Sequence, residues 1–132
     1  MSLIYYLTQI QFEHGAVRLL RQECERVGIA RPLVVTDPGV KAAGVLQKAL
    51  DALGDLPFAV FDQTPANPTE AAVRAAVQAY RAHGCDGLVA VGGGSAIDCA
   101  KGIAIAATHD GPLTHYATIE GGSPRITDRA AP

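Results

Sequence analysis

The sequence contains no tryptophan, and its few phenylalanines and tyrosines make up only 5% of the 132 residues. A chain with so few aromatic side chains has little with which to stack on nucleic-acid bases. It also lacks a surplus of positive charge, because 11 lysines and arginines face 13 aspartates and glutamates, a formal net charge of −2. Without that surplus we expect neither a nucleic acid nor a membrane as partner.

Cysteines and long apolar runs are also scarce. Cys24, Cys85 and Cys99 are widely spaced and form no C-x-x-C pair, which is typical of a reducing compartment rather than of a disulfide framework. No stretch of about 20 apolar residues could span a bilayer. The first ten residues lack the basic segment and apolar run of a secretory signal. We therefore expect a soluble cytoplasmic protein.

Hydrophobic residues make up 48% of the chain and charged residues 18%, so we expect one folded domain. Short apolar segments alternate with longer segments of helical periodicity. The short segments are nearly continuous in apolar residues, as in parallel strands covered on both faces. This alternation predicts an α/β fold, a parallel sheet flanked by helices. The expected strands are 33–35, 58–61 and 88–91, with one or two more within 3–12, and the expected helices are 16–27, 40–53 (broken near Gly44), 68–83 and 95–108.

The last part of the chain has a different character. Residues 111–132 show no clear periodicity and are punctuated by Gly121, Gly122 and Pro124. A compact domain rarely ends on so long an irregular stretch. We therefore expect an α/β domain over residues 1–110, followed by a segment that is either a disordered tail or a lead into a further domain.

The most informative segment is a glycine-rich turn. A buried strand runs into Gly92, Gly93 and Gly94 and then directly into a helix. Such a turn gathers free backbone N–H groups and the positive end of a helix at the carboxyl end of a strand, which favours a phosphate or pyrophosphate. It matches neither the Walker loop nor the G-x-G-x-x-G pattern. A tight structural turn without a ligand is the alternative.

The helix after this turn carries three polar residues of interest. Ser95 and Asp98 have the spacing of a capping-box variant, and a capping role for Ser95 is compatible with a contact to phosphate. Asp98 and Lys101 are the only charged residues on a helix that is otherwise apolar almost all round, so we expect that helix to be buried. The two charges would then either face a cleft or pair with each other.

Residues 92–101 read Gly-Gly-Gly-Ser-Ala-Ile-Asp-Cys-Ala-Lys and resemble the G-G-G-S-x-x-D-x-A-K signature of the iron-containing alcohol dehydrogenase family. Residues 12–16 are similar to its F-G-x-G-A opening, with Glu13 in place of the usual glycine. Residues 67–69 resemble its N-P-T turn. The resemblance implies a Rossmann-like N-terminal domain like that of dehydroquinate synthase. In the family an all-helical metal-binding domain follows, so we expect this chain to be truncated before it.

The resemblance also implies a chemistry and a set of contacts. A family enzyme transfers a hydride between NAD(P) and an alcohol or aldehyde, while iron or zinc polarises the substrate oxygen. On this reading the pyrophosphate is held by the glycine turn and Ser95, the adenosine ribose by Asp37, and the adenine lies near Asn67. Asp98 and Lys101 would lie toward the nicotinamide. No catalytic residue or metal ligand is assigned within the chain, so we expect it to be inactive alone.

The residues themselves leave two roles open at both other turns. Asp37 follows a strand, where a carboxylate accepts hydrogen bonds from ribose hydroxyls and repels a 2′-phosphate, which favours NAD over NADP. Asp37 before Pro38 is also an ordinary capped helix start, and the two roles are compatible. Asn67, Pro68 and Glu70 likewise predict a helix start with Asn67 as N-cap. Without the resemblance we would interpret Asn67 as purely structural.

Two other functional hypotheses stay open. One is a related enzyme of the same architecture: a maleylacetate reductase, a glycerol dehydrogenase or a dehydroquinate synthase-like enzyme. Ser95, Asp98 and Lys101 together favour the alcohol dehydrogenase branch. The other hypothesis is a nucleotide-binding module without catalysis. If the chain is truncated, apolar surface left open beside the missing half would promote self-association, so we expect a homo-oligomer.

Overall fold

The computed structural model of the protein describes residues 8–117 and 121–132. At its centre lies a parallel sheet of the strands β1 (Pro32–Val35), β2 (Ala59–Phe61) and β3 (Gly87–Ala90), in the order β2-β1-β3. Val34 in the middle strand lies opposite Val60 on one side and Val89 on the other. The three strands predicted from apolar runs are thus confirmed to within a residue or two at their ends.

Helices connect the strands, as expected. Gly44, with φ +79°, separates α2 from α3 at the predicted break in the second helical stretch. The first stretch begins as a short 3-10 helix before it becomes α-helical. The elements are η1 (Ala16–Leu19), α1 (Leu20–Arg26), α2 (Pro38–Ala42), α3 (Val45–Leu53), α4 (Glu70–Ala82) and α5 (Gly94–Ala106).

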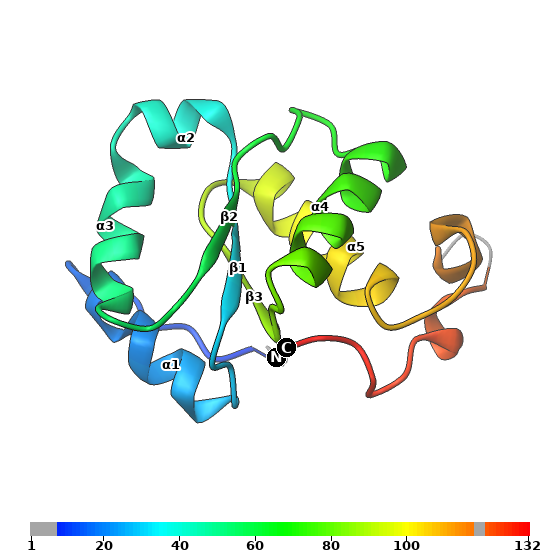
Figure 1. The fold of residues 1–132 in the computed structure, drawn as a ribbon, viewed down its shortest axis with the longest axis horizontal. Coiled ribbons are helices and arrows are strands. Elements are labelled where there is room, and N and C mark those ends of the chain that lie inside the picture. The colour runs from blue at the N-terminus through cyan, green and yellow to red at the C-terminus, as the bar shows by residue number, and fades with distance from the viewer. Residues whose placement is uncertain (1–7, 118–120) are drawn as a thin grey trace, which may run out of the picture.

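The helices form two layers, one on each face of the sheet (Figure 1). Leu33 and Val35 of β1 pack into the core beneath α4 and α5, whereas Val34 points to the opposite core beneath α1 and α3. All three side chains are fully buried. Because both faces of β1 are covered, its sequence reads as a continuous apolar run rather than as an alternation.

One predicted element is not found where it can be checked. Of the strands expected within 3–12, residues 1–7 lie outside the described residues, and residues 8–12 form no strand. Ile10 is 66% exposed and Phe12 is 97% exposed. Among the described residues, neither edge strand of the sheet, β2 or β3, pairs with this segment.

The irregular C-terminal segment lies against the rest of the domain. It contains the 3-10 helices η2 (Leu113–Tyr116) and η4 (Ser123–Arg125) and then returns to the sheet. There the backbone N–H of Leu88 donates to the carbonyl of Pro132 at 2.7 Å, and that of Ala131 donates to Ala104 at 3.1 Å. The division into residues 1–110 and 111–132 stays a prediction. Among the helices of the described residues, none has the length and apolar character needed to cross a membrane.

Candidate functional site

The carboxyl ends of the three strands meet at one edge of the sheet, where α2, α4 and α5 begin (Figure 1). This edge is the usual ligand-binding edge of a parallel α/β sheet. Thr36, directly after β1, is fully buried there. Its N–H donates to the Phe61 carbonyl at 2.9 Å, and its hydroxyl donates to the Val91 carbonyl at 2.7 Å. The ends of all three strands are therefore joined through one residue.

Gly92 opens the glycine turn in a conformation that requires glycine. Its φ is +144°, which L side chains rarely adopt. A Cβ at this position would also lie 3.2 Å from the Cβ of Ala96 and 3.3 Å from a methyl group of Val40. Backbone strain and close packing within the chain are thus sufficient to explain this glycine.

Gly93 and Gly94 differ from Gly92 in both respects. Gly93 is the N-cap of α5 with φ −88° and ψ −160°, an extended conformation open to other residues, and no side chain caps the helix. A Cβ on Gly93 or Gly94 would meet no atom within 4 Å. The start of α5 therefore has open space beside it and no side chain capping its first amides, an arrangement suited to an anion at a helix N-terminus.

Ser95 does not cap α5, so the prediction of a capping role was wrong. The helix begins at Gly94, which places Ser95 inside the first turn. Its hydroxyl instead donates to the carbonyl of Ala66 in the loop between β2 and α4. That bond comes from a different element and ties this loop to the N-terminus of α5. Asn67 directly follows Ala66 and is therefore one residue away from this link to α5.

Asn67 is not the N-cap of α4, and this prediction was also wrong. Thr69 occupies that position, and its hydroxyl accepts the Ala72 N–H at 3.1 Å. The helix consequently starts at Glu70, two residues later than the prediction, and Pro68 lies before the cap. A threonine hydroxyl caps as an asparagine does, so the helix start could fall at either residue on local sequence alone.

Asp37 is the N-cap of α2, as one of its two interpretations predicted. Its Oδ1 accepts the N–H of Val40 at 2.8 Å. Its Oδ2 takes part in no hydrogen bond within the described residues and lies 3.5 Å from the position that a Cβ on Gly92 would occupy. The half-buried carboxylate therefore lies directly against the glycine turn with one oxygen unused.

Asp98 and Lys101 are both exposed and do not pair with each other in the part of the chain that the structure describes. The ion pair considered for them is therefore absent. Nor is α5 buried all round, because Ile97 on the same side is 43% exposed. The buried side of α5 is Ala96, Cys99, Ala100, Ile103 and Ala106. Whether Asp98 and Lys101 face a cofactor stays a prediction.

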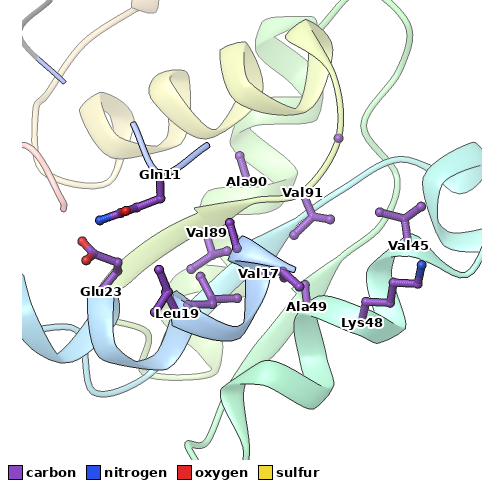
Figure 2. Close-up of a pocket in the computed structure, with 13 residues that line it drawn as sticks. Gln11, Val17, Leu19, Glu23, Val45, Lys48, Ala49, Val89, Ala90 and Val91 are labelled. Atoms are coloured by element: carbon purple, nitrogen blue, oxygen red, sulfur yellow. The ribbon is translucent and has the colours of Figure 1, made fainter. Parts of the chain in front are cut away.

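An apolar groove on the α3 side of β3 was not predicted from the sequence. Figure 2 shows the residues that line this groove between η1, α1, α3 and the end of β3. Its volume is about 470 Å³. Gln11, Glu23 and Lys48 supply its long polar side chains, and it reaches Gly92 at one end. No sequence signal could have located it, because its walls come from three segments far apart in the chain. The residues of the apolar wall include Ala16, Val17, Leu20, Val45, Ala49, Val89, Ala90 and Val91.

The same edge of the sheet offers no ligand set for a metal ion. Among residues 8–117 and 121–132, no three or more His, Cys, Asp or Glu side chains gather closely enough to hold one. His14 and His83 are exposed. His109 instead accepts the N–H of Thr127 on its Nε2 at 3.0 Å. Burial raises the pKa of the Cys99 thiol, so this thiol is no ready thiolate ligand.

The sequence profile described as iron-containing alcohol dehydrogenase matches residues 8–132. The chain belongs to this family. It is 70% identical over all 132 residues to a 4-hydroxybutyrate dehydrogenase of Cupriavidus necator, of which it covers 35%.

Solved structures of the family share the fold. The chain superimposes on the NADH-dependent butanol dehydrogenase A of Thermotoga maritima with a TM-score of 0.78 at 25% identity, covering 88% of this chain and 30% of that one. It matches the sulfoacetaldehyde reductase of Bifidobacterium kashiwanohense, solved in complex with NAD⁺, with a TM-score of 0.73 at 27% identity, covering 87% and 31%. The sheet is thus the Rossmann-like N-terminal part of these enzymes. This chain spans about a third of the length of the relatives that it matches.

Proposed function

We propose that this chain is the NAD-binding part of an oxidoreductase that transfers a hydride between a small alcohol or aldehyde and the nicotinamide. One observation carries the proposal. Gly93 and Gly94 lack side chains for no reason that lies within the chain, since neither strain nor packing forbids a Cβ there. Glycines at such open positions allow a ligand to approach the backbone closely.

The pyrophosphate of the cofactor is the ligand that suits this position. It would accept hydrogen bonds from the free amides at the start of α5, with the positive end of the helix dipole beside its charge. The Ser95 hydroxyl donates its hydrogen bond to the carbonyl of Ala66 and so would not donate to the phosphate. The role proposed for Ser95 is therefore to hold the loop that carries Asn67 against the N-terminus of α5.

The free oxygen of Asp37 supports a preference for NAD over NADP. Because Oδ1 is occupied by the Val40 N–H, Oδ2 is the atom left to accept a ribose hydroxyl. A 2′-phosphate at the same place would be repelled by the carboxylate. The butanol dehydrogenase is NADH-dependent and the sulfoacetaldehyde reductase was solved with NAD⁺, which agrees with this preference.

The substrate proposal rests on sequence identity. The relative that is 70% identical over this chain acts on 4-hydroxybutyrate, and we propose a small primary alcohol of that kind as the substrate. The described residues hold no ligand set for the iron after which the family is named, so no step of the reaction is assigned to a metal in this chain. The role of these residues is to bind and orient the dinucleotide. The 132 residues alone are accordingly expected to be inactive.

A direct assay tests the function. The protein at its natural length, purified and supplied with Fe²⁺ or Zn²⁺, is mixed with NAD⁺ and 4-hydroxybutyrate, and NADH formation is followed by absorbance. We expect turnover with 4-hydroxybutyrate and, more weakly, with simple primary alcohols of similar length. Binding of NADH without turnover of any alcohol or aldehyde would instead support the non-catalytic nucleotide-binding module.

A further inference from the structure

Thr36 occupies a position where its backbone and its side chain serve different strands. The backbone N–H bonds to Phe61 at the end of β2, and the carbonyl accepts the N–H of Thr64 at 3.3 Å. Only the hydroxyl is directed to β3, where it meets the Val91 carbonyl at 2.7 Å. The side chain thus supplies the link that the backbone of β1 can no longer make on this side.

Val91 is the last residue before the glycine turn. Its N–H donates to the Val35 carbonyl at 2.9 Å, and its carbonyl accepts the hydroxyl of Thr36, so the peptide units on both sides of Val91 are held. With both groups of Val91 fixed to β1, the direction in which the chain leaves the sheet at Gly92 is set. Gly92 then turns with φ +144° and delivers the open backbone of Gly93 at the start of α5.

Burial makes this bond structurally demanding. Thr36 is 0% exposed, so its hydroxyl is bonded inside the core, and its removal would leave the Val91 carbonyl without the donor that now holds it. The free energy lost would be recovered most readily by a shift of the peptide after Val91, which belongs to the glycine turn. The loss of one hydroxyl in the core would therefore displace the turn rather than only lower stability.

Resting on the function proposed above, we propose that Thr36 is a positioning residue for the dinucleotide site. It does not touch the cofactor. Its hydroxyl fixes the Val91 carbonyl and so holds the amides at the start of α5 in the geometry that binds the pyrophosphate. Thr36 also directly precedes Asp37, so one residue sets the relation between the two proposed contact points of the cofactor.

A pair of substitutions at Thr36 isolates the contribution of the hydroxyl. Thr36→Val keeps the shape and removes the donor, whereas Thr36→Ser keeps the donor. Thr64→Val is the matched control, because Thr64 is 2% exposed at the same edge and its hydroxyl oxygen has no hydrogen-bond partner within the described residues. The dissociation constants of NADH, ADP-ribose and adenosine are measured for each variant at the natural length of the protein.

We expect Thr36→Val to weaken the binding of NADH and of ADP-ribose by about tenfold, the factor that corresponds to a net hydrogen bond of about 1.4 kcal/mol. Thr36→Ser and Thr64→Val should bind both within about twofold of wild type. Adenosine, which has no pyrophosphate, should bind equally well to all four proteins, a result that general destabilisation would not give. Urea unfolding confirms that each variant is folded, and Thr36→Ala replaces the valine variant if that one is not.

Two results would overturn the inference: equal NADH affinity of Thr36→Val and wild type, or a loss in Thr36→Ser as large as in Thr36→Val. A wild-type protein that binds none of the three ligands would contradict the proposed function itself, and with it this inference. The failure of the two proposals is therefore distinguishable in one set of titrations.

Discussion

The two carboxylate oxygens of Asp37 have different surroundings, and this difference separates its two roles. Oδ1 caps α2 by accepting the N–H of Val40, while Oδ2 lies beside the glycine turn. Asparagine caps a helix as well as aspartate does, but it has no charge with which to repel a 2′-phosphate. Asp37→Asn therefore tests the cofactor role without loss of the cap.

We expect Asp37→Asn to unfold in urea at the wild-type midpoint and to narrow the ratio of NADH to NADPH affinity by about tenfold. Asp37→Ala should narrow the ratio as well and in addition lose about 1 kcal/mol of stability with the cap. Both ratios come from fluorescence titrations with the two reduced cofactors. An unchanged ratio in Asp37→Asn, or tighter binding of NADPH by wild type, would remove Asp37 from the cofactor site.

The ion pair between Lys41 of α2 and Asp62 after β2 makes stability depend on pH. The hydrogen bond from the Lys41 ammonium, at 2.5 Å, lowers the pKa of the Asp62 carboxyl below its ordinary value. A carboxyl whose folded pKa is lowered adds stability above its unfolded pKa of about 3.9, and that stability is lost as the pH falls through the folded pKa.

Asp62→Asn should accordingly cost less than about 1 kcal/mol at pH 7, because the Lys41 side chain is largely exposed and solvent screens the pair. The difference from wild type should shrink in urea unfolding as the pH falls below the unfolded pKa of about 3.9, and vanish once the carboxyl is protonated in the folded protein. A destabilisation that is as large at acid pH as at pH 7 would show that Asp62 acts through packing rather than through its charge.

At the scale of secondary structure, the type and order of the strands and helices between residues 16 and 106 could be predicted from the sequence, whereas several of their ends could not. Apolar periodicity and glycines with positive φ, such as Gly44, mark elements through local physics. Helix starts depend on which hydroxyl is free to cap. Ser95 is of a residue type that caps helices and lies close to the start of α5, but its hydroxyl donates to the Ala66 carbonyl in the loop between β2 and α4. Such a contact is invisible to local patterns.

The start of α4 provides a test of the corrected cap. Thr69→Ala removes the hydroxyl that accepts the Ala72 N–H and should lower stability by about 1 kcal/mol. Asn67→Ala is the matched control and should change stability by less than about 0.5 kcal/mol. Chemical denaturation of the two variants beside wild type decides between them. A larger loss for Asn67→Ala than for Thr69→Ala would restore the original prediction of Asn67 as cap.

At the scale of the whole molecule, the parallel topology explains why the candidate site could be located from the sequence. Asp37, Asn67 and Gly93 are far apart in the chain, yet each follows a strand, and all carboxyl ends of a parallel sheet lie at one edge. The groove beside β3 and the linking role of Thr36 could not be predicted, because they depend on side chains of separate elements coming into contact. The order of strands and helices can be predicted from periodicity in the sequence, whereas contacts between side chains of separate elements are seen only in the folded structure.

The central claim is that the open backbone at Gly93 binds the pyrophosphate of a dinucleotide. Its most direct test is NADH titration of Gly93→Ala and Gly93→Val. Because the backbone is extended and a Cβ meets no atom within 4 Å, both variants should stay folded, with a loss of no more than about 1 kcal/mol because alanine and valine are poorer N-caps than glycine. We predict that NADH affinity falls with the size of the side chain, by roughly a hundredfold or more for valine, a loss of about 2.7 kcal/mol. Wild-type NADH affinity in a folded Gly93→Val protein would contradict the account.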